Sequence, residues 1–214
     1  MPEVEPMAKR VEEARRRVPA QRAVLAAVSG IDGSGKGFVA AQLAATLSAR
    51  GLRVATLNVD GWLNLPQVRF DASDPAQHFY RHAIRFDEMF AQLVEPLRDR
   101  RSVDVEVDFA EETATAFRPE RYVFRDIDAI VVEGILLLKR ELQPRYDVSF
   151  WLECSFETAL ERALARGQEH LSREETVRAY LTTYFPAQEI HLARDDPRRA
   201  ASAIVVNDAR LGTA

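Results

Sequence analysis

Short apolar runs alternate with longer stretches of helical periodicity along the chain. The runs are almost continuously apolar and end in glycine or polar residues, which is typical of strands buried on both faces of a sheet. Because strands and helices alternate throughout, the pattern favours an α/β fold, a parallel sheet with helices on both faces. The predicted buried strands are residues 23–28, 53–59, 129–134, 148–152 and 203–206.

Helix signals separate these strands. In the first helix, apolar residues recur at every fourth position, and Gly51 gives a C-terminal stop. Asp74 can cap a long helix, since a proline follows at the first helical position, and this helix is expected to run to about Leu97. The predicted helices begin at Lys36, Asp74, Ser155 and Ser172.

A hairpin and an N-terminal helix complete the predicted elements. Residues 102–109 alternate apolar and acidic side chains, which is typical of a half-exposed strand, and 116–124 is predicted to pair with it. No internal repeat, low-complexity segment or change in composition marks a second domain. The predicted organisation is therefore an N-terminal helical extension at 1–22 and one domain at 23–214.

Composition places the chain among globular proteins. Its 214 residues include a single cysteine, Cys154, which excludes an internal disulfide framework. The formal net charge of −4 lacks the basic excess expected of a nucleic-acid-binding surface. The N-terminus has no apolar signal-peptide core, and no apolar run has the length of a membrane span. We expect a cytoplasmic protein with no nucleic-acid or membrane partner, and the sequence leaves a homo-oligomer open.

The strongest chemical signal is Gly30-Ile31-Asp32-Gly33-Ser34-Gly35-Lys36-Gly37, which matches the G-x-x-x-x-G-K pattern of a phosphate-binding loop. Glycines let main-chain N–H groups point at phosphate oxygens, the following helix presents its positive end, and Lys36 adds a full charge. The pattern follows a predicted strand and opens a predicted helix, as the motif requires. The alternative is a glycine-rich turn with an unrelated lysine. The predicted ATP-binding residues are Gly30, Asp32, Gly33, Ser34, Gly35, Lys36, Gly37 and Phe38.

The motif lacks one of its usual residues. The position after the lysine normally carries Ser or Thr, whose hydroxyl binds Mg²⁺, but Gly37 stands there and Phe38 follows. Because Mg²⁺ commonly keeps several water ligands, water or a nearby carboxylate can replace the hydroxyl. The alternative is a protein in which catalysis is weak or absent.

Two acidic residues end predicted strands. Ligands of parallel α/β sheets bind at the carboxyl ends of the strands, and both Asp60 and Glu133 fall there. Glu133 is placed to order Mg²⁺ through water, and Asp60 is the candidate base for the proton of a substrate hydroxyl. The alternative is that both acids only cap turns or helices.

Several short segments, in this order, resemble those of one family. They are Ile31 to Lys36 of the loop, Asn58-Val59-Asp60-Gly61-Trp62, Phe86-Asp87, Val131-Val132-Glu133-Gly134-Ile135, Ala165-Arg166-Gly167 and Tyr184-Phe185-Pro186. Together they resemble the uridine kinase and phosphoribulokinase family of P-loop kinases, from about residue 23 to 208. The resemblance implies a P-loop NTPase fold of three α/β/α layers, with a five-stranded parallel sheet, a small β-hairpin and a lid. It also implies that ATP with Mg²⁺ phosphorylates a primary hydroxyl, most often the 5′-hydroxyl of uridine or cytidine.

By position, the resemblance assigns Lys36 to the phosphates, Asp60 to the catalytic base and Glu133 to the metal. It makes Arg162 and Arg166 lid cations over the transferred phosphate, since a guanidinium binds phosphate oxygens in pairs. The alternative for both arginines is a solvated helix face. The catalytic candidates are Lys36, Asp60, Arg162 and Arg166, and the metal-binding candidates are Asp60 and Glu133.

The departures from the family fall on the acceptor side. Where uridine kinases carry an acid that holds the ribose hydroxyls, this chain has Arg81, followed by His82. The segment that matches the base-contacting residues keeps Asp108 but lacks the tyrosine and the histidine. Arg81 and His82 can instead bind an anionic acceptor or lie on a solvated helix face, and Trp62 can stack on a substrate or pack in the core. The candidate acceptor-binding residues are Asp60, Trp62, Arg69, Arg81, His82 and Asp108.

The sequence therefore predicts an ATP-dependent kinase for a hydroxyl of a small molecule, with a pyrimidine nucleoside as the leading acceptor. A second hypothesis keeps the fold and changes the acceptor to a sugar, a sugar phosphate or a vitamin precursor. A third is a nucleotide-binding regulator without transferase activity, suggested by Gly37 and by a lid shorter than the arginine-rich lid usual in the family.

Overall fold

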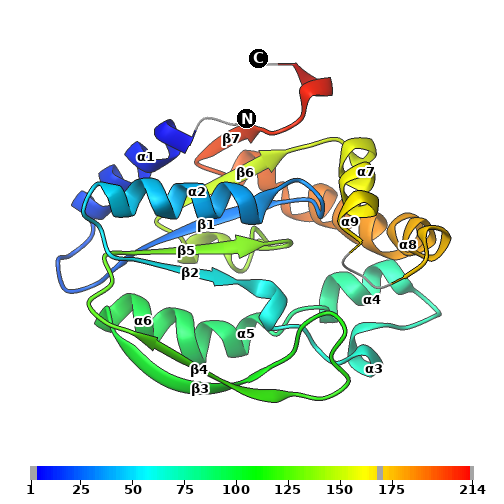
Figure 1. The fold of residues 1–214 in the computed structure, drawn as a ribbon, viewed down its shortest axis with the longest axis horizontal. Helices are drawn as coiled ribbons and strands as arrows, with labels where there is room; N and C mark the ends of the chain where they lie inside the picture. Colours follow the sequence, from blue (N-terminus) through cyan, green and yellow to red (C-terminus); the bar gives the residue numbers. More distant parts are fainter. Residues whose placement is uncertain (1–3, 168–170, 213–214) are drawn as a thin grey trace.

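A computed structural model describes residues 4–167 and 171–212, and a five-stranded parallel sheet runs through its centre (Figure 1). The strand order is β2-β5-β1-β6-β7, so β1 lies between β5 and β6. The sheet confirms the predicted α/β fold with five parallel strands. The strands are β1 Val24–Gly30, β2 Val54–Asn58, β5 Ala129–Gly134, β6 Val148–Glu153 and β7 Ala203–Val206.

Helices cover both faces of the sheet (Figure 1). Successive residues of a strand point to opposite faces, so the completely buried β1 contributes to two cores. Val24 and Val28 pack with α1 and α2, whereas Leu25 packs with α4, α5 and α6. Two π-helical segments connect helices: Phe90–Val94 joins α5 to α6, and Tyr180–Tyr184 joins α8 to α9. The helices are α1 Val4–Arg17, α2 Lys36–Ala49, α3 Pro66–Arg69, α4 Pro75–His82, α5 Phe86–Met89, α6 Glu95–Arg100, α7 Phe156–Arg166, α8 Arg173–Ala179, α9 Phe185–Asp195 and α10 Pro197–Ala200.

The N-terminal helix α1 packs against α2 and the sheet. Met7, Ala8 and Val11 are buried in the core that α2 and β1 also form. On its more exposed side, Glu12 forms an ion pair with Arg50 at the end of α2 (Oε2–Nη1, 2.7 Å). The predicted division of the chain after residue 22 stays a prediction, and α1 shares its core with the elements that follow.

The single helix predicted over 74–97 is wrong, because α4 and α5 are separate helices. Between them, the chain pairs with the segment after β2. The N–H of Asn64 donates to the carbonyl oxygen of Ala83 (2.9 Å), and the N–H of Arg85 donates to that of Trp62 (2.9 Å). These hydrogen bonds use backbone groups that a continuous helix would pair internally, so a long-range contact overrides the local helical pattern.

The predicted antiparallel hairpin is confirmed, with strands β3 (Val103–Phe109) and β4 (Arg118–Phe124). It lies beside α5 and α6 (Figure 1). After β3, the N–H of Ala110 donates to the carbonyl oxygen of Gly61 (3.1 Å). A Cβ on Gly61 would lie 2.4 Å from the Phe109 ring, so the missing side chain lets this ring approach the backbone. The hairpin thereby reaches the end of β2.

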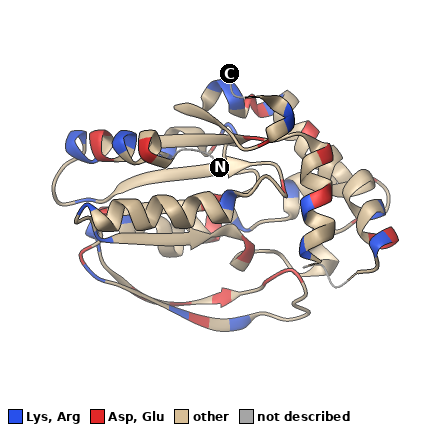
Figure 2. Cartoon of the chain, turned by 45° about the horizontal axis from the view of Figure 1, so that its top comes forward, with Lys and Arg blue, Asp and Glu red and all other residues tan. Residues whose placement is uncertain are grey.

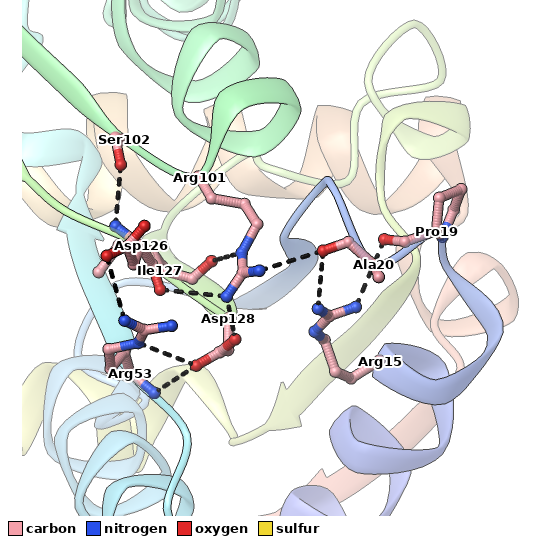
Figure 3. A network of polar contacts seen from close by, with 9 residues as sticks. All are labelled: Arg15, Pro19, Ala20, Arg53, Arg101, Ser102, Asp126, Ile127 and Asp128. Carbon is pink, nitrogen blue, oxygen red and sulfur yellow. Dashed lines mark hydrogen bonds and ion pairs between the residues drawn. The ribbon is translucent and has the colours of Figure 1, made fainter.

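A polar network joins the amino ends of β2 and β5 (Figure 3). Arg101 forms an ion pair with Asp128 and donates to the carbonyl oxygens of Ile127 (2.9 Å) and Ala20 (3.1 Å). Asp128 also accepts the main-chain N–H of Arg53 (3.0 Å). The network therefore ties together the segments before β1, β2, β3 and β5 at one edge of the sheet.

Charged residues of both signs are spread over the hairpin and several helices, whereas α2 is almost free of charge (Figure 2). Within residues 4–167 and 171–212, no helix combines the length and the apolar character that crossing a membrane requires.

Candidate active site

The loop that matches the phosphate-binding motif, residues 30–36, joins β1 to α2. Gly33 and Gly35 have φ angles of 75° and 89°, a left-handed conformation that glycine adopts without steric cost. A Cβ on Gly33 would lie 2.4 Å from the carbonyl oxygen of Ala159, and one on Gly35 would lie 2.6 Å from Nδ2 of Asn207. Both the backbone conformation and the close neighbours therefore require glycine.

Lys36 is the first residue of α2 and is only 8% exposed. Its Nζ donates a hydrogen bond to the carbonyl oxygen of Ile31 within the loop (2.9 Å). The ammonium charge and the N-terminal end of α2 act on the same small volume, which is the arrangement that binds the phosphates of a nucleotide.

A cavity of about 700 Å³ opens in front of this loop, at the carboxyl ends of the central strands. This is the edge of the sheet at which ligands of open α/β folds bind. The cavity brings together many of the residues predicted from the sequence. These are Asp32, Gly33, Gly35, Lys36, Gly37, Phe38, Asp60, Arg69, Glu133 and Arg166.

Asp60 enters the cavity from the turn that follows β2. The Asn58 side chain accepts the main-chain N–H of Asp60 (2.7 Å) and caps a 3₁₀ turn at Val59–Gly61. Asp60 lines the cavity and is exposed there to solvent. Partial desolvation by the cavity walls raises the pKa of its carboxyl, the charge of Lys36 opposes the rise, and that of Asp32 adds to it. A raised pKa suits a carboxylate that has to accept a proton near neutral pH.

Glu133 lies at the end of β5 and is 7% exposed. Burial raises the pKa of its carboxyl from 4.5 to about 7, and the negative charge of Asp60 adds to the effect while Lys36 opposes it. The folded protein therefore binds this proton more tightly than the unfolded chain does, and the free energy of unfolding falls as the pH rises from 4.5 to about 7.

Replacing Glu133 with glutamine should stabilise the nucleotide-free protein above pH 7, because glutamine has a similar shape and carries no charge to bury. The shift from 4.5 to about 7 corresponds to a gain on the order of 3 kcal/mol in the free energy of unfolding at pH 8, and the gain should vanish near pH 4.5. Urea unfolding at several pH values measures it.

The exposed Glu106 on the hairpin provides the matched control, since Glu106→Gln removes the same charge from a solvated site. A Glu133→Gln protein that is less stable than wild type at pH 8, or whose stability difference does not change with pH, would contradict the role given to burial.

The two predicted lid arginines lie in different places. Arg162 does not line the cavity; it supports the loop from behind, donating to the carbonyl oxygens of Asn207 (2.9 Å) and Ser34 (3.3 Å). Arg166 lines the cavity, with Nη2 3.7 Å from Oδ1 of Asp32. Of the two, only Arg166 lies where it could contact a nucleotide phosphate directly.

Four predicted acceptor-binding residues do not line this cavity. Trp62 is 1% exposed and packs in the core. Arg81 borders a second cavity of about 310 Å³, and the ring of His82 lies 4.6 Å from that of His78 on the surface of α4. Asp108 is exposed on the hairpin. The fold does not bring these four side chains together with Asp60.

Three polar residues that hold the loop are not among the site residues predicted from the sequence. The Tyr180 hydroxyl donates to Oδ2 of Asp32 (2.6 Å), and Oε1 of Gln188 accepts the Asp32 N–H (2.8 Å). Nδ2 of Asn207 donates to the carbonyl oxygen of Ser34 (2.7 Å). Asn207 follows a predicted strand, so the strand-end rule that selected Asp60 applies to it also. No comparable sequence signal marks Tyr180 or Gln188, which lie inside a helical stretch.

The wall across from the loop is aromatic and acidic. It comes from α4, the hairpin with the turn after β3, and the π-helical segment before α9. Its flat rings and carboxylates, together with the cations already described, line the cavity. The residues of this wall are Phe79, Phe109, Glu111, Glu112, Tyr122 and Tyr184.

The residues beside Gly37 fit a magnesium ion that arrives with a nucleotide. A Cβ on Gly37 would lie 3.6 Å from Oε1 of Glu133, so a carboxylate oxygen stands next to the place of the missing hydroxyl. Carboxylate oxygens and water are the ligands that Mg²⁺ prefers. No group of three or more His, Cys, Asp or Glu residues within the described ranges could hold a metal ion by itself. Nucleotide phosphates would therefore have to supply part of the coordination.

None of the protein-family models matches the chain. Among solved structures, it is similar to one described as a possible uridine kinase from Bacillus stearothermophilus, with 18% identity over 93% of this chain and 98% of that chain, and a TM-score of 0.69. Phosphoribulokinase from Rhodobacter spheroides is 13% identical over 88% and 71%, with a TM-score of 0.60. D-glycerate 3-kinase from Cryptococcus neoformans is 13% identical over 87% of both chains, with a TM-score of 0.58. The chain thus has the fold shared by the uridine kinase and phosphoribulokinase group of P-loop kinases.

Proposed function

We propose that the protein is an ATP-dependent phosphotransferase that acts on a hydroxyl group of a small molecule. The observation that carries this proposal is the shared cavity of Asp60 and the phosphate-binding loop. A candidate base, a phosphate lysine and room for a second molecule then face one another. Phosphoryl transfer needs little more than such positioning and charge stabilisation.

In the proposed reaction, the Asp60 carboxylate accepts the proton of the acceptor hydroxyl. The hydroxyl oxygen forms a bond to the γ-phosphorus of ATP, and the bond from that phosphorus to the β,γ-bridging oxygen breaks, which leaves ADP. Lys36 and the N–H groups of the loop stabilise the negative charge on the phosphate oxygens. Arg166, which lines the cavity, is proposed to contact the transferred group.

Magnesium, when bound with the nucleotide, would neutralise charge on the β- and γ-phosphates. Glu133 and Asp60 are the residues proposed to hold it through water ligands. The pKa of Glu133 is raised to about 7, and a bound cation would shift this carboxyl further toward its ionised form.

The choice of acceptor is a separate matter from the reaction. The hypothesis that the acceptor is a pyrimidine nucleoside is supported by the rings of Phe109 and Tyr122, which line the cavity and could stack on a base. The positions that match nucleoside-binding residues of uridine kinases give it no such support, since Arg81 and Asp108 lie outside the cavity. Sugars, sugar phosphates and other small hydroxyl compounds are the alternatives.

ADP release from ATP and Mg²⁺ tests the proposal across a panel of neutral and acidic hydroxyl compounds that includes uridine, cytidine, fructose, fructose 6-phosphate and glycerate. One acceptor class should stimulate ADP release strongly over the rate without acceptor. If ATP binds but no compound stimulates ADP release, the nucleotide-binding regulator is the better description.

Serine at position 37 should lower the magnesium concentration that gives half-maximal activity several-fold. Gly37→Ser supplies the hydroxyl ligand usual at this position, and the nearest side-chain atom to its Cβ would be 3.6 Å away, an ordinary contact distance. Gly37→Ala is the matched control, because it adds the same bulk without the hydroxyl. If both variants are equally impaired, crowding at the start of α2 explains the glycine, and the account of the metal site is wrong.

A further inference from the structure

Arg69 ends the short helix α3 and lines the candidate active-site cavity. It is 3% exposed, and its guanidinium lies 4.8 Å from the centre of the Phe70 ring. Figure 1 shows α3 beside α4 and the turn that connects the two hairpin strands, away from the start of α2. Arg69 therefore adjoins the aromatic and acidic wall across from the phosphate-binding loop, and this wall together with Arg69 is called the acceptor wall.

The charge of Arg69 has no ionic partner in the parts of the chain that the structure describes. Its Nη2 donates one hydrogen bond, to the main-chain carbonyl oxygen of Glu112 (2.7 Å). Its Nε is buried and has no hydrogen-bond partner among the residues that the structure describes. Within residues 4–167 and 171–212, no carboxylate lies within ion-pair distance of the guanidinium, although Glu112 and Asp60 are close enough to favour its charged form.

Arg85, the other arginine buried in the described ranges, shows how a buried guanidinium charge is usually stabilised. It forms an ion pair with Glu88 (Nη1–Oε2, 2.6 Å) and donates to the carbonyl oxygens of Leu63 (3.3 Å) and Asp108. Burying a charge is costly unless it is paired and hydrogen-bonded, and Arg85 meets both conditions.

Arg69 meets neither condition fully, and burial lowers the pKa of its guanidinium. An arginine stays protonated in this situation, so the unpaired charge persists. A buried cation with free donors, at the wall of a cavity, is complementary to an anion that enters the cavity. The planar guanidinium matches carboxylate and phosphate groups, to which it can donate two hydrogen bonds in parallel.

The other cations of the cavity have different partners. Lys36 binds within the phosphate loop, and Arg166 lies against Asp32 and donates to the Tyr180 hydroxyl (3.4 Å). Both therefore lie on the nucleotide side. Arg69 is the cation that the acceptor wall contributes.

We propose that Arg69 binds an anionic group of the acceptor, a carboxylate or a phosphate, so that the substrates are acidic hydroxyl compounds and not neutral nucleosides or sugars. This inference rests on the proposed function in one respect: it assumes that the acceptor and ATP share this cavity. Loss of the guanidinium then removes a charge-assisted contact with the acceptor and leaves the phosphate-binding loop intact.

The proposed binding of an anion by Arg69 is tested by calorimetric titration of acceptor probes into the protein, with the phosphate-binding loop saturated by the non-hydrolysable analogue AMP-PNP and Mg²⁺. The probes are pairs that differ in the anion, glycerate against glycerol and fructose 6-phosphate against fructose, together with uridine. An acidic probe should bind at least about 10-fold more tightly than its neutral counterpart, because a hydrogen bond to a charged group is worth that much or more. The carboxylate and phosphate pairs distinguish the two kinds of anion.

The same titration of Arg69→Gln should show a loss of about 10–100-fold in affinity for the acidic probe, with Arg69→Lys intermediate. Arg121→Gln is the matched control, because Arg121 lies on the exposed side of the hairpin and pairs with Asp104 there (2.8 Å). Thermal unfolding of each variant verifies that it is folded.

The outcomes separate the two proposals. Arg69-dependent binding of an acidic probe without ADP release from ATP supports the anion site and overturns the kinase assignment. Tight binding and turnover of uridine or another neutral probe, unchanged in Arg69→Gln, supports the kinase and overturns the anion site. Failure of every acidic probe to bind better than its neutral counterpart also overturns the anion site.

Discussion

Replacement of Asp60 with asparagine is expected to lower kcat by about 10²–10⁴-fold, the usual effect of removing a positioned general base. Asparagine keeps the size of the side chain but cannot accept the proton of the acceptor hydroxyl. The affinity for ATP should change little, because the phosphate contacts come from residues 30–36 on the opposite wall. Steady-state kinetics with the best acceptor and calorimetry with AMP-PNP measure the two quantities.

Asp99→Asn is a suitable control, since Asp99 is an exposed aspartate at the end of α6 that pairs with its neighbour Arg98 (2.8 Å). It should leave kcat unchanged. If Asp60→Asn retains more than about a tenth of wild-type turnover, Asp60 is not the base, given the usual size of that effect.

Replacement of Lys36 with alanine is expected to weaken ATP binding by about 100-fold and to remove measurable turnover. Hydrogen bonds to charged groups are worth about 1.5–3 kcal/mol each, and the Lys36 ammonium is placed to make more than one with the phosphates. The loss should be larger for turnover than for binding, because charge on the transferred group grows in the transition state. Nucleotide titration and the ADP-release assay measure both.

Lys9→Ala is the matched control, since Lys9 lies exposed on α1, far along the chain from the loop. The fold of Lys36→Ala should persist, because Gln188 and Asn207 still hydrogen-bond the loop when the bond from the lysine to the Ile31 carbonyl oxygen is lost. Wild-type affinity for ATP in Lys36→Ala would refute the assignment of the phosphate-binding loop.

The sheet and the loop were predictable because their signals are local. Continuous apolar runs identify the buried strands, and the glycine pattern between β1 and α2 identifies the loop. The reasons for two of the glycines are not local. Gly33 approaches the backbone of Ala159, and Gly35 approaches Asn207, so neighbours more than a hundred positions away exclude a side chain there.

The missed features depend on contacts between distant segments. Local periodicity favoured one helix over 74–97, but the pairing of Ala83 and Arg85 with the segment after β2 interrupts it. Tertiary context also decides the acceptor wall. Both Arg81 and Arg69 are acceptor-binding candidates by sequence, and an anion-binding role is considered for Arg81. The fold shows that Arg69 is buried at the cavity whereas Arg81 lies outside it.

The Arg101–Asp128 network lies at the amino ends of the strands, whereas the cavity opens at their carboxyl ends. The five residues of β2 alone separate the two edges by about 17 Å, at roughly 3.4 Å per residue. Substitutions this far apart usually have additive effects. Libraries that diversify the acceptor wall can therefore be paired with stabilising changes around the network, chosen independently of any substrate. Because of the same separation, related proteins can evolve specificity for different acceptors while the Arg101–Asp128 network stays unchanged.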